Sequence, residues 1–258
     1  REIKFREFLD HADRLGAKYI ATGHYAQIDS NPTALSLLKG NDPSKDQSYF
    51  LYTLGQAELQ HTLFPIGTML KSEVRQIARS LGMPNADRKD STGICFIGER
   101  RFRDFLARYL PPSPGQICTL DDTVIGEHQG LWFYTLGQRH GLNIGGPGDA
   151  WYVAAKDMSR NVLRVVQGHD HPALMRDSAQ AEELSWVEND PPQFPFRCSA
   201  KTRYRQADQA CTLSRIGPDK IEITFEQPQR AITPGQALVL YDGSRLIGGG
   251  VFCDLING

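Results

Sequence analysis

Cys95 is the residue whose type and setting best suit covalent chemistry. It stands in a short loop after the small residues 91–93, and the arginine-rich segment 99–103 follows it closely. The thiolate is the reactive form of cysteine, and neighbouring cations favour it. This pattern indicates a sulfur nucleophile or a sulfur carrier. The alternative is a small buried side chain at the start of a strand, because free cysteine is among the most buried residue types.

A glycine and a histidine form a second candidate site. His24 follows Gly23 at the end of an expected strand, residues 18–26, where a backbone amide and an imidazole could both face a ligand. A histidine that is hydrogen-bonded for structural reasons is the alternative. The polar loop 40–47 is a third candidate, although loops of this composition are most often solvated turns.

The segment 201–206 (KTRYRQ) combines cations with an aromatic residue and an amide. These side chains are suited to contacting a phosphate backbone and stacking an unpaired base. On a strand, Lys201, Arg203 and Arg205 would share one face, and Tyr204 would point away from it. All four reach one partner only if the segment bends. The later segment 234–236 predicts a plain turn.

Composition limits the possible functions. The chain has 258 residues and a net charge of −1, so nucleic acid binding would require a local patch of charge. The five cysteines include no CxxC pair and no regular spacing, which predicts neither a disulfide framework nor a zinc or other metal site. No apolar run approaches the length of a membrane-spanning helix, so we expect a reducing, cytoplasmic setting without membrane contact.

The amino-terminal elements predict part of an α/β domain. An amphipathic helix over 1–15 precedes the strand 18–26, and ligands gather at the carboxyl ends of such strands. One such unit cannot cover both faces of a parallel sheet, so we expect further strands upstream of Arg1. A hairpin over 26–39 follows, and then come expected helices at 48–54, 72–81 and 101–110.

From residue 115 onward the chain is rich in short strands. Segments 151–156 and 162–166 predict a hairpin. A regular series of strands after residue 171 predicts a small β-barrel or a sandwich, at 181–187, 198–204, 210–216, 220–225, 237–241 and 248–253.

Motifs along nearly the whole chain resemble the bacterial tRNA-specific 2-thiouridylase family (MnmA type). They occur in that family's order, at 21–26 (ATGHYA), 45–51 (KDQSYFL), 91–98 (STGICFIG), 134–139 (YTLGQR), 151–154 (WYVA) and 201–206 (KTRYRQ). The resemblance implies an α/β remnant of a pyrophosphatase-loop nucleotide-binding domain, a small central α+β domain and a carboxyl-terminal all-β barrel. The expected boundaries are 1–64 with 87–101 for the first domain, 65–86 with 102–166 for the second, and 167–258 for the barrel.

The resemblance also implies a reaction, which is ATP-dependent thiolation of the wobble uridine at C2 through a cysteine persulfide. ATP with Mg²⁺ is expected as cosubstrate, with no stable prosthetic group. The anticodon arm of tRNA (Lys, Glu and Gln acceptors) and a sulfur-relay protein are the expected partners. The implied site residues are Cys95 for the persulfide, Gly23 for ATP, and His24, Lys45, Asp46, Gln47, Arg203, Tyr204 and Gln236 for tRNA.

The sequence departs from the family pattern in one respect. The ATP-binding loop and the first catalytic cysteine are expected upstream of Arg1, so we expect these 258 residues alone to be inactive. Two other functions stay open at this point. One is another pyrophosphatase-loop adenylating ligase, which would not need Cys95 or the segment 201–206, and the other is an RNA-binding β-barrel module without catalysis.

Overall fold

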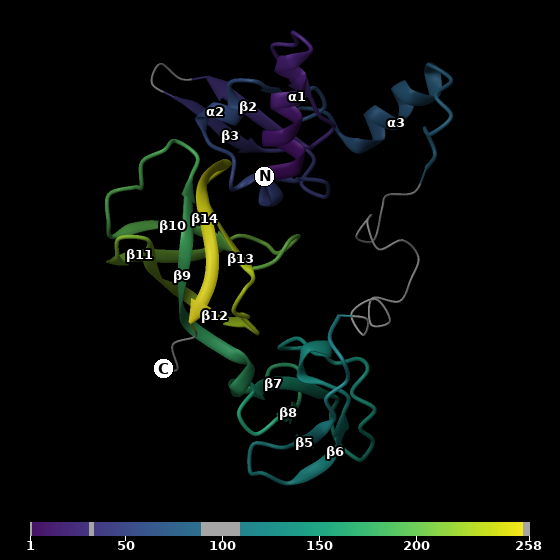
Figure 1. Ribbon diagram of the computed structural model, residues 1–258, viewed down its shortest axis with the longest axis vertical. Coiled ribbons are helices and arrows are strands. Elements are labelled where there is room, and N and C mark those ends of the chain that lie inside the picture. Colours follow the sequence, from purple (N-terminus) through teal and green to yellow (C-terminus); the bar gives the residue numbers. More distant parts are fainter. Residues whose placement is uncertain (1, 31–33, 89–108, 255–258) are drawn as a thin grey trace. The chain divides into compact units, whose positions relative to one another are not determined.

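The computed structural model describes residues 2–30, 34–88 and 109–254 (Figure 1). Cys95 and nearly all of the expected helix 101–110 lie outside these residues. The chain forms two compact units, which are described separately. The first contains residues 1–88, 177–227 and 234–258, and the second contains residues 89–176 and 228–233.

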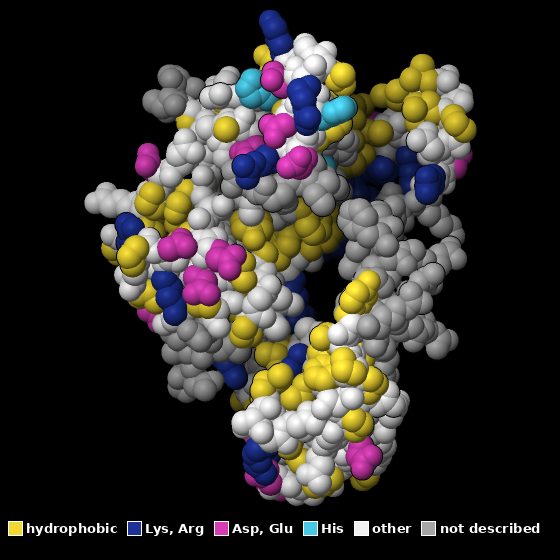
Figure 2. All heavy atoms as spheres, viewed as in Figure 1, with side chains coloured by type: hydrophobic (Ala, Val, Ile, Leu, Met, Phe, Trp, Pro, Cys, Tyr) yellow, Lys and Arg dark blue, Asp and Glu magenta, His cyan; other side chains and the backbone are white. Residues whose placement is uncertain are grey.

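The first unit begins with short helices and strands. A π-helical turn, Glu2–Glu7, continues into α1 (Phe8–Arg14), and then the chain enters β1 (Ile20–Ala21). Acidic and basic side chains intermix over α1, in keeping with the near-zero net charge (Figure 2). The remaining elements of this part are β2 (Ala26–Ser30), β3 (Leu35–Lys39), the 3-10 helix η2 (Ser48–Leu51), α2 (Gln56–Leu59), β4 (Thr62–Leu63) and α3 (Lys71–Ser80).

Strands β1 and β4 run parallel, with Ile20 paired to Thr62 and Ala21 to Leu63. The expected hairpin over 26–39 is confirmed as the antiparallel pair β2–β3. The helix expected over 48–54 is shorter than predicted, because only its first four residues form the 3-10 helix.

Helix α3 is confirmed close to its predicted bounds, but it differs from the other helices in its packing. None of its residues is buried, and apolar side chains lie exposed on and beside it, as Figure 2 also shows. Its amino-terminal end is held by Asp42, whose Oδ2 accepts a hydrogen bond from the Lys71 N–H at 2.9 Å. That bond, together with those from Ser44, lowers the pKa of Asp42.

The second part of this unit is a closed barrel of six strands, which decides between the two architectures that the sequence left open. The strand order β13-β10-β11-β12-β9-β14 closes into a ring because β13 also pairs with β14. The strands are β9 (Met175–Trp186), β10 (Phe196–Lys201), β11 (Gln209–Gly217), β12 (Lys220–Arg230), β13 (Ala237–Asp242) and β14 (Arg245–Asp254).

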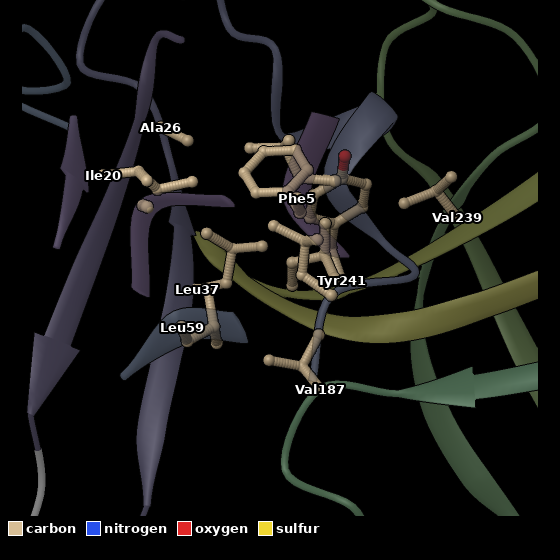
Figure 3. Close-up of a cluster of buried hydrophobic side chains, with 12 residues drawn as sticks. Phe5, Ile20, Ala26, Leu37, Leu59, Val187, Val239 and Tyr241 are labelled. Carbon is tan, nitrogen blue, oxygen red and sulfur yellow. The ribbon is translucent and has the colours of Figure 1, made fainter. Parts of the chain in front are cut away.

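The barrel and the amino-terminal part share one sheet and one core. Strand β3 pairs with β14, which extends the barrel sheet by the hairpin β2–β3. Their buried side chains form a single cluster, in which Phe5, Leu37 and Leu59 pack with Tyr241 and other barrel residues (Figure 3). The predicted domain boundaries remain a prediction, while the structure unites the two segments in one compact body.

Two cysteines face each other inside the barrel. Cys198 of β10 pairs in register with Cys211 of β11, and their sulfur atoms are 3.7 Å apart. The hydrogen bond with Cys211, followed by burial, raises the pKa of the Cys198 thiol. The four cysteines that the structure describes, Cys118, Cys198, Cys211 and Cys253, are all free thiols.

The second unit is built on a four-stranded sheet in the order β6-β5-β8-β7. The expected hairpin over 151–166 is confirmed as β7 (Trp151–Asp157) with β8 (Val162–Gln167). Strands β5 (Gly115–Cys118) and β6 (Val124–His128) complete the sheet, and two 3-10 turns follow, η3 (Leu131–Phe133) and η4 (Pro172–Leu174). Among the described residues, no helix of either unit is long and apolar enough to cross a membrane.

His128 of β6 is buried in a fixed tautomer. Its Nδ1 accepts a hydrogen bond from the Gly130 N–H at 3.0 Å, so Nε2 holds the ring proton and lies 3.1 Å from the carbonyl oxygen of Asn161. Burial lowers the pKa of His128, and the hydrogen bond to Asn161 opposes that effect. A second proton on Nδ1 would abolish the bond from Gly130.

We therefore expect His128 to make the second unit sensitive to acid. Its folded pKa lies below the unfolded value of about 6.5, so its stabilising contribution is complete above that pH and is lost as the pH falls further. Melting temperatures of the wild type and His128→Gln between pH 8 and pH 5.5 test this. The melting temperature of the wild type should fall more on acidification than that of the variant. Equal falls in both proteins would contradict the role given to His128.

Candidate functional site

The structure brings the Gly23–His24 segment and the polar loop 40–47 together. Gln47 of the polar loop is bonded twice to Tyr25, the residue after His24. The Tyr25 N–H donates to Gln47 Oε1 at 3.1 Å, and the Gln47 N–H donates to the Tyr25 carbonyl at 2.9 Å. His24 and Tyr25 follow the carboxyl end of β1, where open α/β sheets bind their ligands, and these two bonds hold Gln47 beside them.

His24 is half-buried and held on several sides. Its Nδ1 is hydrogen-bonded to Thr22 Oγ1, and its ring lies 5.9 Å from the ring of Phe5 and 6.2 Å from that of Phe64. Phe64 follows β4 as His24 follows β1, so neighbouring parallel strands deliver both rings to the same edge. These contacts give His24 a structural role, and its predicted contact with RNA stays a prediction.

Gly23 is exposed, and the fold itself does not require a glycine there. A Cβ on Gly23 would meet only the Cδ1 of Ile66, at 3.9 Å. Gly67 shows the opposite case, because a Cβ there would lie 1.8 Å from the Ala26 carbonyl oxygen. The open space over Gly23 leaves its backbone accessible to a bound molecule.

The side chain of Asp46 stabilises the polar loop through hydrogen bonds to its backbone. Its buried carboxylate accepts hydrogen bonds through Oδ1 from the Gly40 N–H at 3.0 Å and from the Ser48 N–H at 3.1 Å. Its Oδ2 lies 3.7 Å from the Nζ of Lys201 in the barrel. This carboxylate therefore shapes the loop, while its half-exposed neighbours Lys45 and Gln47 are better placed to face a ligand.

Lys201 points inward, which departs from the simplest expectation for the segment 201–206. Its side chain is 13% exposed, lies 3.7 Å from Asp208 as well as from Asp46, and sits 5.3 Å from the ring centroid of Tyr241. Lys39 reaches the same ring at 4.3 Å and pairs with Asp208 at 2.5 Å. Sequence reasoning missed this cluster, because nothing local to Lys39, Asp208 or Tyr241 links them.

The rest of the segment leaves the strand and bends. Strand β10 ends at Lys201, and Arg205 takes a left-handed backbone conformation with φ of 67°. Gln206 stabilises the turn, since its Oε1 accepts hydrogen bonds from the N–H and the hydroxyl of Thr202 at 2.8 and 2.9 Å. This is the bent geometry in which cations and Tyr204 can reach one partner.

Tyr204 packs against aromatic residues that follow the polar loop. Its ring centroid is 4.4 Å from that of Phe50 and 6.1 Å from that of Tyr49. Tyr49 is anchored by its hydroxyl, which donates to the Ala237 carbonyl at 3.0 Å. Burial raises the pKa of Tyr49 to about 12, although the nearby charge of Arg203 opposes the shift.

Gln236 precedes the residue that anchors Tyr49. Its carbonyl accepts a hydrogen bond from the Phe252 N–H at 2.9 Å, which fixes the turn 234–236 against β14. Its side-chain Oε1 is buried and has no hydrogen-bond partner among the described residues. A buried amide oxygen without a partner is costly, and a ligand donor would satisfy it.

Contacts of the loop 45–47 therefore link Tyr25, which follows His24, with Lys201 at the end of β10. Cys95 is outside the described residues. Within the described residues, no group of three His, Cys, Asp or Glu side chains is arranged to hold a metal ion.

Known families match the chain along most of its length. Residues 1–99 match the model described as tRNA methyl transferase HUP domain, residues 103–167 the tRNA methyl transferase PRC-barrel domain, and residues 176–252 the aminomethyltransferase beta-barrel domain. The domain order agrees with the three-part layout that the sequence predicts.

Curated relatives are similar to nearly the whole chain. The tRNA-specific 2-thiouridylase MnmA of Nitrosomonas europaea is 56% identical over 254 residues, which cover 97% of this chain and 70% of the relative. The proteins of the same name from Ralstonia nicotianae and Methylococcus capsulatus are 58% and 56% identical, over 97% of this chain and 69% of each relative. The domain models are described by methyl transfer, but these relatives match the chain continuously and are all named for thiolation.

The two glycines of the site region differ in what an added methyl group would do. Gly67→Ala should destabilise the first unit by about 1–3 kcal/mol, because the Ala26 backbone must move. Gly23→Ala should stay within about 0.5 kcal/mol of the wild type. Urea unfolding followed by circular dichroism measures both, and equal losses would show that Gly23 is also required by the fold.

Proposed function

The chain belongs to the tRNA-specific 2-thiouridylase MnmA family, and we propose that it acts in the ATP-dependent thiolation of the wobble uridine of tRNA at C2. The family match supports thiolation over a different adenylating ligase. The structural observation that best supports a shared ligand site is the double hydrogen bond between Gln47 and Tyr25. It holds the polar loop beside the Gly23–His24 turn.

The proposed reaction needs both an activated uridine and an activated form of sulfur. A uridine carbonyl is a poor electrophile, and adenylation of its C2 oxygen by ATP, with loss of pyrophosphate, supplies a leaving group. The terminal sulfur of a persulfide on Cys95 then becomes bonded to C2, and AMP leaves with the oxygen. A second cysteine takes over the bond to the Cys95 sulfur, so each turnover ends in a disulfide that an external thiol must reduce.

We assign the site residues to two ligands. Gly23 offers its exposed backbone to ATP, with Mg²⁺ as the expected counterion of the phosphates. His24, Lys45, Asp46 and Gln47 form the part nearest the target base, with Asp46 acting through the shape of the loop. The barrel residues Arg203, Tyr204 and Gln236 contact the anticodon arm. A sulfur-relay protein supplies the persulfide, and tRNAs for Lys, Glu and Gln are the proposed substrates.

The role of Cys95 can be tested in cells that lack the complete enzyme. Nucleosides from their tRNA should lose 2-thiouridine derivatives by mass spectrometry, and the wild-type gene should restore them. Cys95→Ser should restore less than about 1% of the wild-type level, because a hydroxyl cannot form a persulfide. Cys253→Ala, which changes a half-buried barrel cysteine, serves as the control. Full restoration by Cys95→Ser would show that Cys95 does not carry the transferred sulfur.

The role of Gly23 can be tested through nucleotide affinity. In the complete enzyme, Gly23→Ala should raise the KM for ATP about tenfold, because the new methyl group occupies the space over the exposed backbone. Gly145→Ala is a matched control, since a Cβ at Gly145 meets no atom within 4 Å and a Cβ at Gly23 meets only Ile66 Cδ1, at 3.9 Å. An unchanged KM in Gly23→Ala would remove Gly23 from the ATP site.

A further inference from the structure

Phe50 is a large apolar residue that the fold leaves exposed beside the site. Helix η2 has about three residues per turn, so Ser48 and Leu51 point the same way, and both are buried. Phe50 lies on the other side and is 54% exposed. A single exposed apolar side chain is ordinary on a protein surface, so it is the position of Phe50, against Tyr204 and close to the loop 45–47, that points to a ligand.

The ring of Phe50 is held in a fixed position. It lies 4.4 Å from the ring of Tyr204 with a tilt of 46°, and 5.5 Å from Tyr49 in an edge-to-face arrangement. Tyr49 is itself anchored to the Ala237 carbonyl. The ring is therefore preorganised before any ligand arrives, which lowers the entropic cost of binding.

The cations of this part of the first unit differ in whether a carboxylate already pairs with them. Lys201 and Lys39 are already paired, Lys201 with the buried carboxylate of Asp46 and both lysines with the exposed carboxylate of Asp208. Arg205 is exposed, and its guanidinium lies 5.4 Å from the ring centroid of Tyr204. The charge of Arg203 also acts on Tyr49. An apolar ring bordered by arginines is complementary to a base that is attached to phosphates.

We propose that Phe50 and Tyr204 form a stacking platform for one unpaired base of the bound RNA, with Arg203 and Arg205 contacting the adjacent phosphates. The inference rests on the proposed function, because it specifies how the tRNA-binding face holds a single-stranded nucleotide. Phe50 lies three residues after Gln47 in the chain, so the stacked base lies beside the loop assigned to the target nucleotide. Phe50 is a positioning residue, since it acts on the base and not on the reacting atoms.

Binding of two RNA probes to the 258-residue chain tests the platform. The first is a 17-nucleotide anticodon stem-loop with a seven-nucleotide loop, and the second is a blunt duplex of the same length. Phe50→Ala should weaken stem-loop binding about 5- to 150-fold, the range that loss of one stacked base produces. Phe50→Trp should stay within about twofold of the wild type, and duplex binding should not change in either variant.

Two further variants distinguish the effect of base stacking from the effect of phosphate contacts and from the loss of any exposed phenylalanine. Phe8→Ala removes a phenylalanine that is 51% exposed on α1, outside the platform, and should leave the Kd unchanged. Arg203→Ala should reduce the slope of log Kd against log salt concentration by about one, whereas Phe50→Ala should leave that slope unchanged. Circular dichroism and melting temperature confirm that each variant is folded.

The outcomes distinguish the platform from the function on which it rests. One outcome is that the wild-type chain binds the stem-loop with a steep salt dependence and Phe50→Ala binds it equally well. That result would contradict the stacking role of Phe50 and would still support RNA binding by this face. The exposed ring would then serve a protein contact. If the wild-type chain prefers neither probe and shows no salt dependence, the RNA-binding face itself is wrong.

Discussion

The pairing of β3 with β14 is the constraint on which the rest of the first unit depends. It joins Leu38 to Arg245 and Leu37 to Leu246, and through these pairs the amino-terminal hairpin becomes part of the barrel sheet. The same junction buries Leu37 and Tyr241 in one core. Segments that are more than 150 residues apart in the chain, the loop 45–47 and the turn 201–206, therefore belong to one compact unit and can act on one ligand.

Buried charge then sets the position of the loop relative to the barrel. Asp46 and Lys201 are both largely withdrawn from water, and such a pair adds little net stability because desolvation offsets the attraction. We infer that its value lies in specificity, because the pair forms only when the loop lies against the end of β10. Tyr241 completes the arrangement, because its ring lies within reach of two lysines and its hydroxyl is 3.1 Å from Ser48 Oγ. Burial raises the pKa of Tyr241, so the phenol stays neutral and remains a hydrogen-bonding group.

Periodicity and turn residues predict most of the elements, as the six barrel strands and the hairpin β7–β8 show. They do not predict the side-chain orientations that depend on tertiary contacts. Lys201 has the same local pattern as Arg203, yet it faces a buried carboxylate because β10 ends there and the backbone turns at Arg205. Tyr241 lies in an ordinary apolar run, and the exposed Phe50 differs from the buried Leu51 only through the orientation of a short 3-10 helix. These properties depend on strand pairing between distant residues, which no local pattern contains.

The facing thiols of Cys198 and Cys211 have a consequence for sulfur chemistry elsewhere in the enzyme. A persulfide passes its outer sulfur to thiolates, so any ionised cysteine would compete as an acceptor. The raised pKa of Cys198 keeps that thiol protonated at neutral pH, and its partner Cys211 is buried. Cys198 is therefore a poor competitor for the outer sulfur of a persulfide, because its thiol stays protonated.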